Sequence, residues 1–129
     1  MYMKNIEKLL EIEALTENIT KHFAENNLLR MKILYFISQY QNLSVGMIID
    51  KLGIKKSNFA LMTKELEKEG LVVSKQGEID KRCRMLFLTE KGKNELESYF
   101  LKLKEFFKDD DMEVSKAIIS LNAYLNRKI

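Results

Sequence analysis

The sequence predicts a mainly α-helical fold with one small β-hairpin, an α+β arrangement. Three observations predict it. Apolar residues recur at helical spacing along most of the chain. Residues 71–88 instead contain two short apolar runs around a charged turn, which is the pattern of a hairpin. The 129 residues include no proline and only five glycines, which favours helices joined by short turns within a single domain, residues 1–129.

Two amphipathic helices are expected in the first forty residues. The first runs from about Lys4 to Phe23, with charged residues between its apolar positions. Those apolar positions are Ile6, Leu9, Ile12, Leu15, Ile19 and Phe23. Asn26-Asn27 breaks the pattern. A second helix is expected from about Leu28 to Tyr40, and its many large apolar side chains predict a central place in the core.

A short third helix is expected from Val45 to about Lys51. Gln41-Asn42-Leu43-Ser44 is the expected turn before it, and the Ser44 hydroxyl can accept a hydrogen bond from an unpaired backbone N–H at the helix start. Gly53 is expected to end the helix, because glycine tolerates a positive φ.

A longer fourth helix is expected from about Lys56 to Glu69, with Gly70 as its C-cap. The third and fourth helices are joined through Leu52-Gly53-Ile54, which is the order of a helix-turn-helix. A strand from Leu71 to Lys75, a turn, and a return strand from Cys83 to Leu88 follow. Three helices closed by a hairpin form a winged helix, so we expect a DNA-binding core at about residues 28–88.

The chain continues with two more helices. Thr89 is a candidate N-cap for a long amphipathic helix that ends before Asp109-Asp110-Asp111, and a short last helix follows. The apolar residues of segments 1–25 and 89–129 exceed what a small winged helix has to cover. We therefore expect these segments to be dimerisation helices that flank the winged helix-turn-helix, with a second copy of the chain as their cover.

The first turns of the fourth helix combine lysines with short polar and apolar groups, and no acid occurs before Glu65. Lysine and a helix N-terminus attract phosphate, Ser and Asn can hydrogen-bond base edges, and Leu can contact a thymine methyl group. The candidate DNA-binding residues here are Lys55, Lys56, Ser57, Asn58, Leu61, Thr63 and Lys64. The alternative is a solvent-exposed helix of mixed charge.

The hairpin tip adds Lys81, Arg82 and Arg84 to the candidate DNA-binding residues. In an extended segment Asp80 and Arg82 would share a face, so Asp80 could orient the Arg82 guanidinium, and Arg84 would continue that face. A planar cation at a hairpin tip suits a phosphate or a narrow minor groove. The alternative is a hairpin whose charges only protect its edges.

The pattern Asp80-x-Arg82, five residues, then Leu88-Thr89-x-x-Gly92 resembles the wing signature of the MarR family of winged helix-turn-helix transcriptional regulators. The resemblance implies a homodimer on pseudo-palindromic double-stranded DNA. It also implies that the fourth helix is the recognition helix and that Arg82 is the wing arginine, supported by Asp80. The chain departs from the family at Ala60-Leu61, where members often carry a Ser-Arg-like pair, and its last two helices look short.

The expected function is therefore sequence-specific DNA binding by a transcriptional repressor, released by a small-molecule effector or by a redox change. Cys83 lies between two arginines, which would favour an oxidisable thiol; the alternative is a small strand residue without that role. A second alternative is a winged-helix module that binds an acidic protein and no DNA.

Composition excludes other classes of function. The formal net charge of +3 permits nucleic-acid binding without requiring it. One cysteine and one histidine cannot build a zinc site within one chain, so we expect no cofactor and no metal. Neither a catalytic Ser/His/Asp set nor a glycine-rich phosphate loop occurs, so we expect no enzyme. Charged residues interrupt every long apolar run, so we expect no signal peptide, no membrane contact and a cytoplasmic protein.

Overall fold

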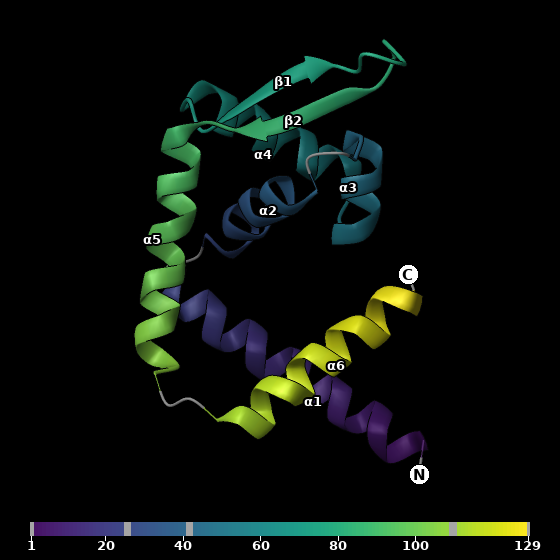
Figure 1. Ribbon diagram of the computed structural model, residues 1–129, viewed down its shortest axis with the longest axis vertical. Coiled ribbons are helices and arrows are strands. Elements are labelled where there is room, and N and C mark those ends of the chain that lie inside the picture. The colour runs from purple at the N-terminus through teal and green to yellow at the C-terminus, as the bar shows by residue number, and fades with distance from the viewer. Residues whose placement is uncertain (1, 25–26, 41–42, 109–110, 129) are drawn as a thin grey trace.

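The computed structural model describes residues 2–24, 27–40, 43–108 and 111–128. Within these residues it confirms the predicted fold class and the order of its elements (Figure 1). The elements are α1 (Tyr2–Phe23), α2 (Leu28–Gln39), α3 (Val45–Leu52), α4 (Lys56–Lys68), β1 (Val72–Gln76), β2 (Arg84–Leu88), α5 (Glu90–Phe106) and α6 (Met112–Lys128). The expected break at Asn26, the turn residues Gln41-Asn42 and the acids Asp109-Asp110 lie outside the described residues.

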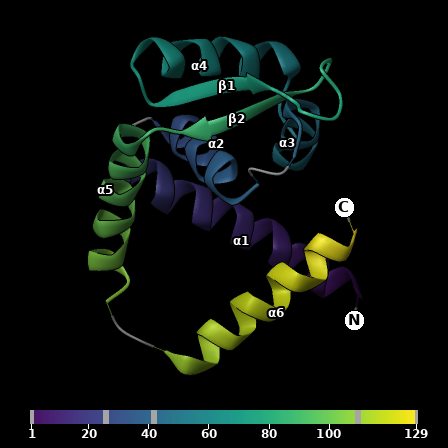
Figure 2. The same ribbon diagram turned by 45° about the horizontal axis from the view of Figure 1, so that its top comes forward.

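Helix α2 is the centre of the core, as its apolar composition predicts. Ile33, Leu34 and Ile37 are completely buried. The helix contacts α3, α4, α5 and strand β2. Figure 2 shows the hairpin between α4 on one side and α2 with α3 on the other. This packing fixes α4 relative to the hairpin, because both share the core built around α2.

Local signals set the ends of α3 and α4. The Ser44 hydroxyl accepts a hydrogen bond from the Met47 backbone N–H at 3.4 Å, and Gly53 has a φ of 67°. Gly70 was the expected C-cap of α4, but the C-cap is Glu69; Gly70 follows it with a φ of 76°. The Leu71 N–H donates to the Leu66 carbonyl at 2.9 Å, so α4 ends in a Schellman motif.

The wing is a two-stranded antiparallel hairpin in which Val72 pairs with Leu88 and Gln76 with Arg84. Each strand begins one residue later than expected. Cys83 therefore belongs to the turn and not to the return strand. The turn takes this residue because the Cys83 N–H bonds to the Asp80 carbonyl at 3.1 Å, which closes a tight turn over residues 80–83.

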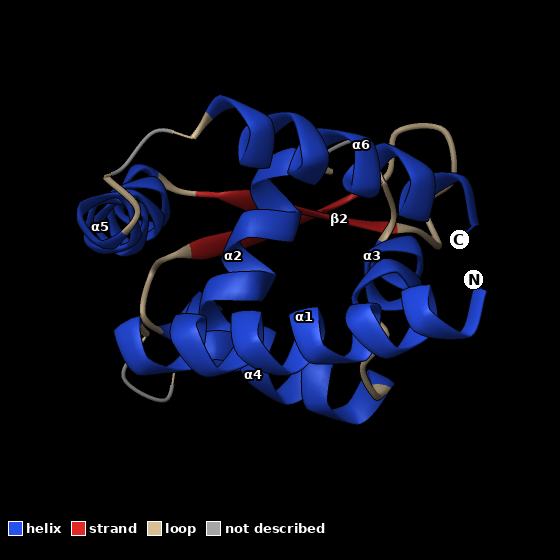
Figure 3. Ribbon diagram, turned by 90° about the horizontal axis from the view of Figure 1, so that it is seen from below, coloured by secondary structure: helices blue, strands red, loops and turns tan. Residues whose placement is uncertain are grey.

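The terminal helices extend away from the winged helix. Helix α5 leads down from the hairpin, and α1 and α6 lie at the far end of the molecule (Figure 1); seen from below, α1 and α6 lie apart (Figure 3). The long helix expected after Thr89 is α5, with 17 residues, whereas the expectation of a short last helix is wrong, since α6 also has 17 residues. Asp111 accepts a hydrogen bond from the Glu113 N–H at 3.0 Å and so supports the start of α6. None of the helices in the described residues is long and apolar enough to cross a membrane.

Candidate nucleic-acid interface

Helix α4 presents a buried side and a solvent-facing side. Phe59 and Leu66 are 1% and 0% exposed and hold the helix against the core. The opposite side carries residues at i, i+4, i+7 and i+11, which share one face of a helix. These residues are Ser57, Leu61, Lys64 and Lys68, and all of them are exposed. The N-terminal half of α4 therefore offers cationic, hydroxyl and apolar groups to solvent without an acid among them.

The structure places most of the predicted α4 residues on the surface. The exposed ones are Lys55, Lys56, Ser57, Asn58, Leu61 and Lys64. The prediction for Thr63 is wrong, because this residue lies on the side of α4 that faces the core. Thr63 is 9% exposed, and its hydroxyl donates to the Phe59 carbonyl at 2.9 Å. A buried hydroxyl that donates to its own helix cannot donate to a base.

The predicted contact between Asp80 and Arg82 is present, but its geometry differs from the expected one. The two residues lie in a turn, where the Arg82 backbone N–H and Nε both donate to Asp80 Oδ1, at 3.0 and 3.2 Å. The second guanidinium bond joins Nη2 to Oδ2 at 3.3 Å. Asp80 thus holds both the backbone and the side chain of Arg82, as an Asx turn with a bidentate ion pair.

This arrangement leaves the guanidinium available to a partner. The Arg82 side chain is 91% exposed although it is bonded to Asp80. The hydrogen bonds from the Arg82 side chain and backbone lower the pKa of the Asp80 carboxyl below its ordinary value of 3.8. The carboxylate is therefore charged at neutral pH and keeps the arginine in a fixed direction at the wing tip.

Arg84 has a different setting from Arg82. Its Nη2 donates to Ser74 Oγ at 2.7 Å across the hairpin. Its side chain borders a hollow between α4 and β2, together with Lys56 and Lys64. The three cations surround a largely apolar floor that includes Ile49, Phe59 and Leu86. Lys81 is exposed in the wing turn, so basic groups occur both at the wing tip and beside α4.

Cys83 is partly buried and not disulfide-bonded. It borders a second hollow, between α3 and the opposite face of the wing, with Met47, Met85 and Phe87. The Asp80 carboxylate interacts with its side chain. A redox role for this thiol stays a prediction.

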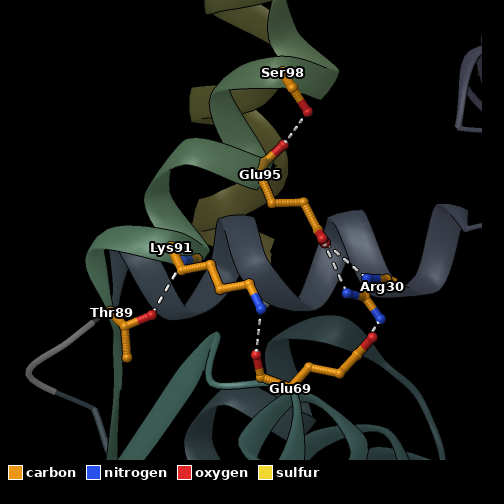
Figure 4. A network of polar contacts seen from close by, with 7 residues as sticks. Arg30, Glu69, Thr89, Lys91, Glu95 and Ser98 are labelled. Carbon is orange, nitrogen blue, oxygen red and sulfur yellow. Dashed lines mark hydrogen bonds and ion pairs between the residues drawn. The ribbon is translucent and has the colours of Figure 1, made fainter.

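A network of charges that the sequence reasoning missed ties the end of α4 to α2 and α5 (Figure 4). Arg30 Nη1 on α2 donates to Glu69 at 2.6 Å, while Nε and Nη2 donate to the two oxygens of Glu95 on α5, at 2.7 and 2.9 Å. Lys91 Nζ adds a bond to the Glu69 carbonyl at 2.9 Å. The available signal was an arginine within a helix rich in large apolar residues, since a cation that is largely removed from water requires acidic partners.

This network pairs the acids Glu69 and Glu95 with the positive charge of Arg30. The two hydrogen bonds that Arg30 donates to the Glu95 carboxylate raise the pKa of Arg30 above its ordinary value, and this effect exceeds the opposing effect of burial. Glu69 is turned toward Arg30, so its negative charge is neutralised locally. The charge of Glu69 is thus offset by Arg30, whereas Glu67 borders the hollow between α4 and β2 together with the basic groups.

Thr89 and Gly92 complete the joint between the wing and α5. The Thr89 hydroxyl accepts from the Gly92 N–H at 3.1 Å, as the predicted N-cap, and donates to the Gly70 carbonyl at 2.6 Å. The Thr89 N–H bonds to the Leu71 carbonyl at 3.0 Å. The residues Leu88-Thr89-x-x-Gly92 thus connect the end of α4, both strands and the start of α5.

Comparisons with known proteins agree with this architecture. The model of the MarR family matches residues 27–83. The HTH-type transcriptional regulator PetP of Rhodobacter capsulatus is 39% identical over 61 residues, which make up 47% of this chain and 37% of PetP. The chain therefore matches little more than a third of the length of this curated relative.

Solved structures are similar over nearly the whole chain. The transcriptional regulator BldR from Sulfolobus solfataricus has a TM-score of 0.76 at 21% identity and covers 96% of each chain. The transcriptional repressor CouR, bound to a 23-mer DNA duplex, has a TM-score of 0.71 at 20% identity and covers 92% of this chain and 89% of its own. MarR from E. coli has a TM-score of 0.72 at 14% identity, covering 92% and 94%.

The relatives named above are described as transcription regulators or belong to the MarR family. At these identities the solved structures establish the fold, and the family model establishes the segment that holds the helix-turn-helix and the wing turn. The chain thus has the fold of MarR-like transcription regulators, and its residues 27–83, which include the helix-turn-helix and the wing turn, match the MarR family model.

Proposed function

We propose that this protein is a transcriptional regulator that binds double-stranded DNA in a sequence-specific manner as a homodimer, and that it acts as a repressor. Helix α4 enters the major groove by its N-terminal half, and Arg82 contacts the adjacent minor groove or its phosphates. The observation that carries the proposal is the exposed, acid-free face of α4, together with an exposed wing arginine held by Asp80.

Charge and shape support DNA as the partner. Lys56, Lys64 and Arg84 border the hollow between α4 and the wing, and these cations attract phosphates on both sides of a groove. The fold is also that of CouR, whose solved structure contains a DNA duplex. We also propose that the protein works in the cytoplasm.

The uncovered apolar surface of the terminal helices supports a homodimer. Helix α6 has no buried side chain among its described residues, although Ile118 and Ile119 are 62% and 69% exposed. On α1, Ile6 and Leu10 are 58% and 63% exposed. Faces of this kind need a cover, and a two-fold partner supplies one that is complementary to both ends of the chain. Two α4 helices would then read half-sites about 34 Å apart.

The joint around Thr89 supports a mechanism of release. Helix α5 is bonded to the end of α4 through Lys91, Glu95 and Arg30. A change in the angle between the α5 helices of the two protomers would therefore move each α4 as a rigid body and change the distance between the recognition helices. A small-molecule effector that binds between the dimer helices and the winged helix would lower DNA affinity in this way.

Fluorescence anisotropy with labelled duplexes tests the proposal. The wild-type protein should bind a duplex from the region upstream of its own gene more tightly than a shuffled duplex of the same composition, and sedimentation should give a dimer. Lys56→Ala/Lys64→Ala should weaken binding at least tenfold, because two phosphate contacts are lost. Lys21→Ala/Lys32→Ala, on α1 and α2, removes the same charge and should bind nearly as the wild type does. Absence of binding to any duplex would favour the alternative of a protein-interaction module.

A further inference from the structure

The solvent-facing side of α4 has an apolar centre. Leu61 is 64% exposed, whereas Phe59 and Leu66 of the same helix are buried. The polar residues Ser57 and Lys64 lie one turn before and after it on the same face. Ala60, beside Leu61, is exposed as well. The middle of the proposed recognition surface therefore has a two-residue segment whose side chains neither donate nor accept hydrogen bonds.

This chemistry narrows what the middle of α4 can recognise. The major-groove edges of the base pairs display hydrogen-bond donors and acceptors, and the one apolar group among them is the 5-methyl group of thymine. A leucine held against a donor or acceptor would leave that group without a partner, which costs binding energy. We infer that Leu61 is a specificity-determining residue that contacts a thymine methyl group, so each DNA half-site carries a T·A pair at this position. The inference rests on the proposed DNA-binding function.

The position of Leu61 argues against a different use for its exposed side chain. Helix α4 lies at the opposite end of the molecule from α1 and α6, so Leu61 does not extend their apolar faces (Figures 1 and 2). Its near neighbours on the helix surface are polar or charged, with Asn58 one turn before it and Lys64 and Glu65 one turn after it, all of them exposed. An apolar side chain set among such groups fits a polar ligand that displays methyl groups, such as the major groove of DNA, better than it fits an apolar protein surface.

Deoxyuridine provides the test, because it differs from thymidine only by the missing methyl group. Duplexes bound by the wild-type protein are selected from a random-sequence library, and each thymine of the selected sequence is then replaced by deoxyuridine in turn. For the wild type, replacement at one position in each half-site should weaken binding about fourfold per half-site, the effect of one buried methyl group. Replacement at the other positions should have little effect.

Variants assign the effect to Leu61. Leu61→Ala should bind the thymine duplex more weakly than the wild type and should no longer distinguish thymine from uracil at the sensitive position. Leu61 is exposed and alanine favours helix, so this variant should keep its fold. Val73→Thr changes an apolar residue of the hairpin that is 42% exposed, and it should retain the wild-type sensitivity.

The outcomes separate the two proposals. DNA binding that is unaffected by uracil at every thymine, or a uracil effect that persists unchanged in Leu61→Ala, overturns the role of Leu61 and leaves the proposed function standing. A protein that enriches no duplex from the library overturns the proposed function, and the role of Leu61 with it.

Discussion

Gly92, in the first turn of α5, packs directly against the backbone carbonyl group of Leu71. A Cβ atom at position 92 would overlap the Leu71 carbonyl oxygen and would lie 3.1 Å from the carbonyl carbon. The same carbonyl accepts the Thr89 N–H at 3.0 Å, so it cannot move away without losing a hydrogen bond. The glycine of the Leu-Thr-x-x-Gly pattern is therefore required by the close approach of α5 to the start of the hairpin.

Gly92→Ala should destabilise the fold. Alanine gains about 1 kcal/mol of helix propensity, but the overlap with fixed backbone costs more, and we expect a net loss of about 1–3 kcal/mol in the free energy of unfolding. Chemical denaturation followed by circular dichroism measures it. Gly46→Ala is the matched control, because a Cβ there would meet only Ser44 Oγ at 4.0 Å, so this variant should gain stability. Equal stability of both variants would contradict the packing argument.

The sequence predicted features that depend on neighbouring residues. The caps at Ser44 and Thr89 and the left-handed glycine at position 53 follow from residue type within one turn of the chain. Helical periodicity also placed α2 in the core. The prediction of a DNA contact for Thr63 is wrong, because Thr63 lies four residues after Phe59, a spacing that puts both on the buried face. Helical periodicity indicates the burial of this residue better than the polarity of its side chain does.

Other features depend on contacts between distant segments and could not be predicted. Arg30 and Glu95 are 65 residues apart in sequence, and no local pattern pairs them. The contact between Asp80 and Arg82 was predicted from an extended spacing, whereas the chain makes it through a tight turn in which the Asp80 side chain also bonds a backbone N–H. The side-chain pairing was predictable because both geometries bring neighbouring opposite charges together.

Arg30→Lys should reduce stability although it keeps the charge. Lysine is a point donor and cannot bond both oxygens of Glu95 and reach Glu69 at the same time. We expect the free energy of unfolding to fall by about 1.5–3 kcal/mol, the value of one hydrogen bond to a charged group. Thermal unfolding measures the change. Lys32→Arg on the exposed side of α2 is the control and should be neutral; a neutral Arg30→Lys would show that the fork geometry contributes nothing.

The Asp80–Arg82 pair should respond to acid in a direction set by the lowered pKa of Asp80. A folded-state pKa below the ordinary value of 3.8 means that the contact is fully formed above about pH 4 and is lost as the pH falls through the folded-state value. The Asp80 carboxyl carbon, followed by NMR, should therefore titrate below pH 3.8.

Two variants make this prediction specific to the pair. Arg82→Ala should raise the Asp80 midpoint toward 3.8, because the two side-chain hydrogen bonds are lost. Lys81→Ala removes an adjacent cation that does not hydrogen-bond to Asp80 within the described part of the chain, and it should change the midpoint much less. An unchanged midpoint in Arg82→Ala would mean that the ion pair does not persist in solution.

Arg82→Ala should weaken binding to most DNA sequences by a similar factor, since a contact to phosphate or to a narrow minor groove carries little base information. The slope of log Kd against log salt concentration should fall by about one unit, because one fewer counterion is released.

Asn58→Ala is the contrasting variant. Asn58 is exposed on α4, and the loss of its base contact should cost about 1–3 kcal/mol at one base pair while the salt slope stays the same. Anisotropy titrations at four salt concentrations on a selected duplex and its point variants distinguish the two patterns. An unchanged slope in Arg82→Ala, or a loss in Asn58→Ala that is equal for all sequences, would contradict the role assigned to that residue.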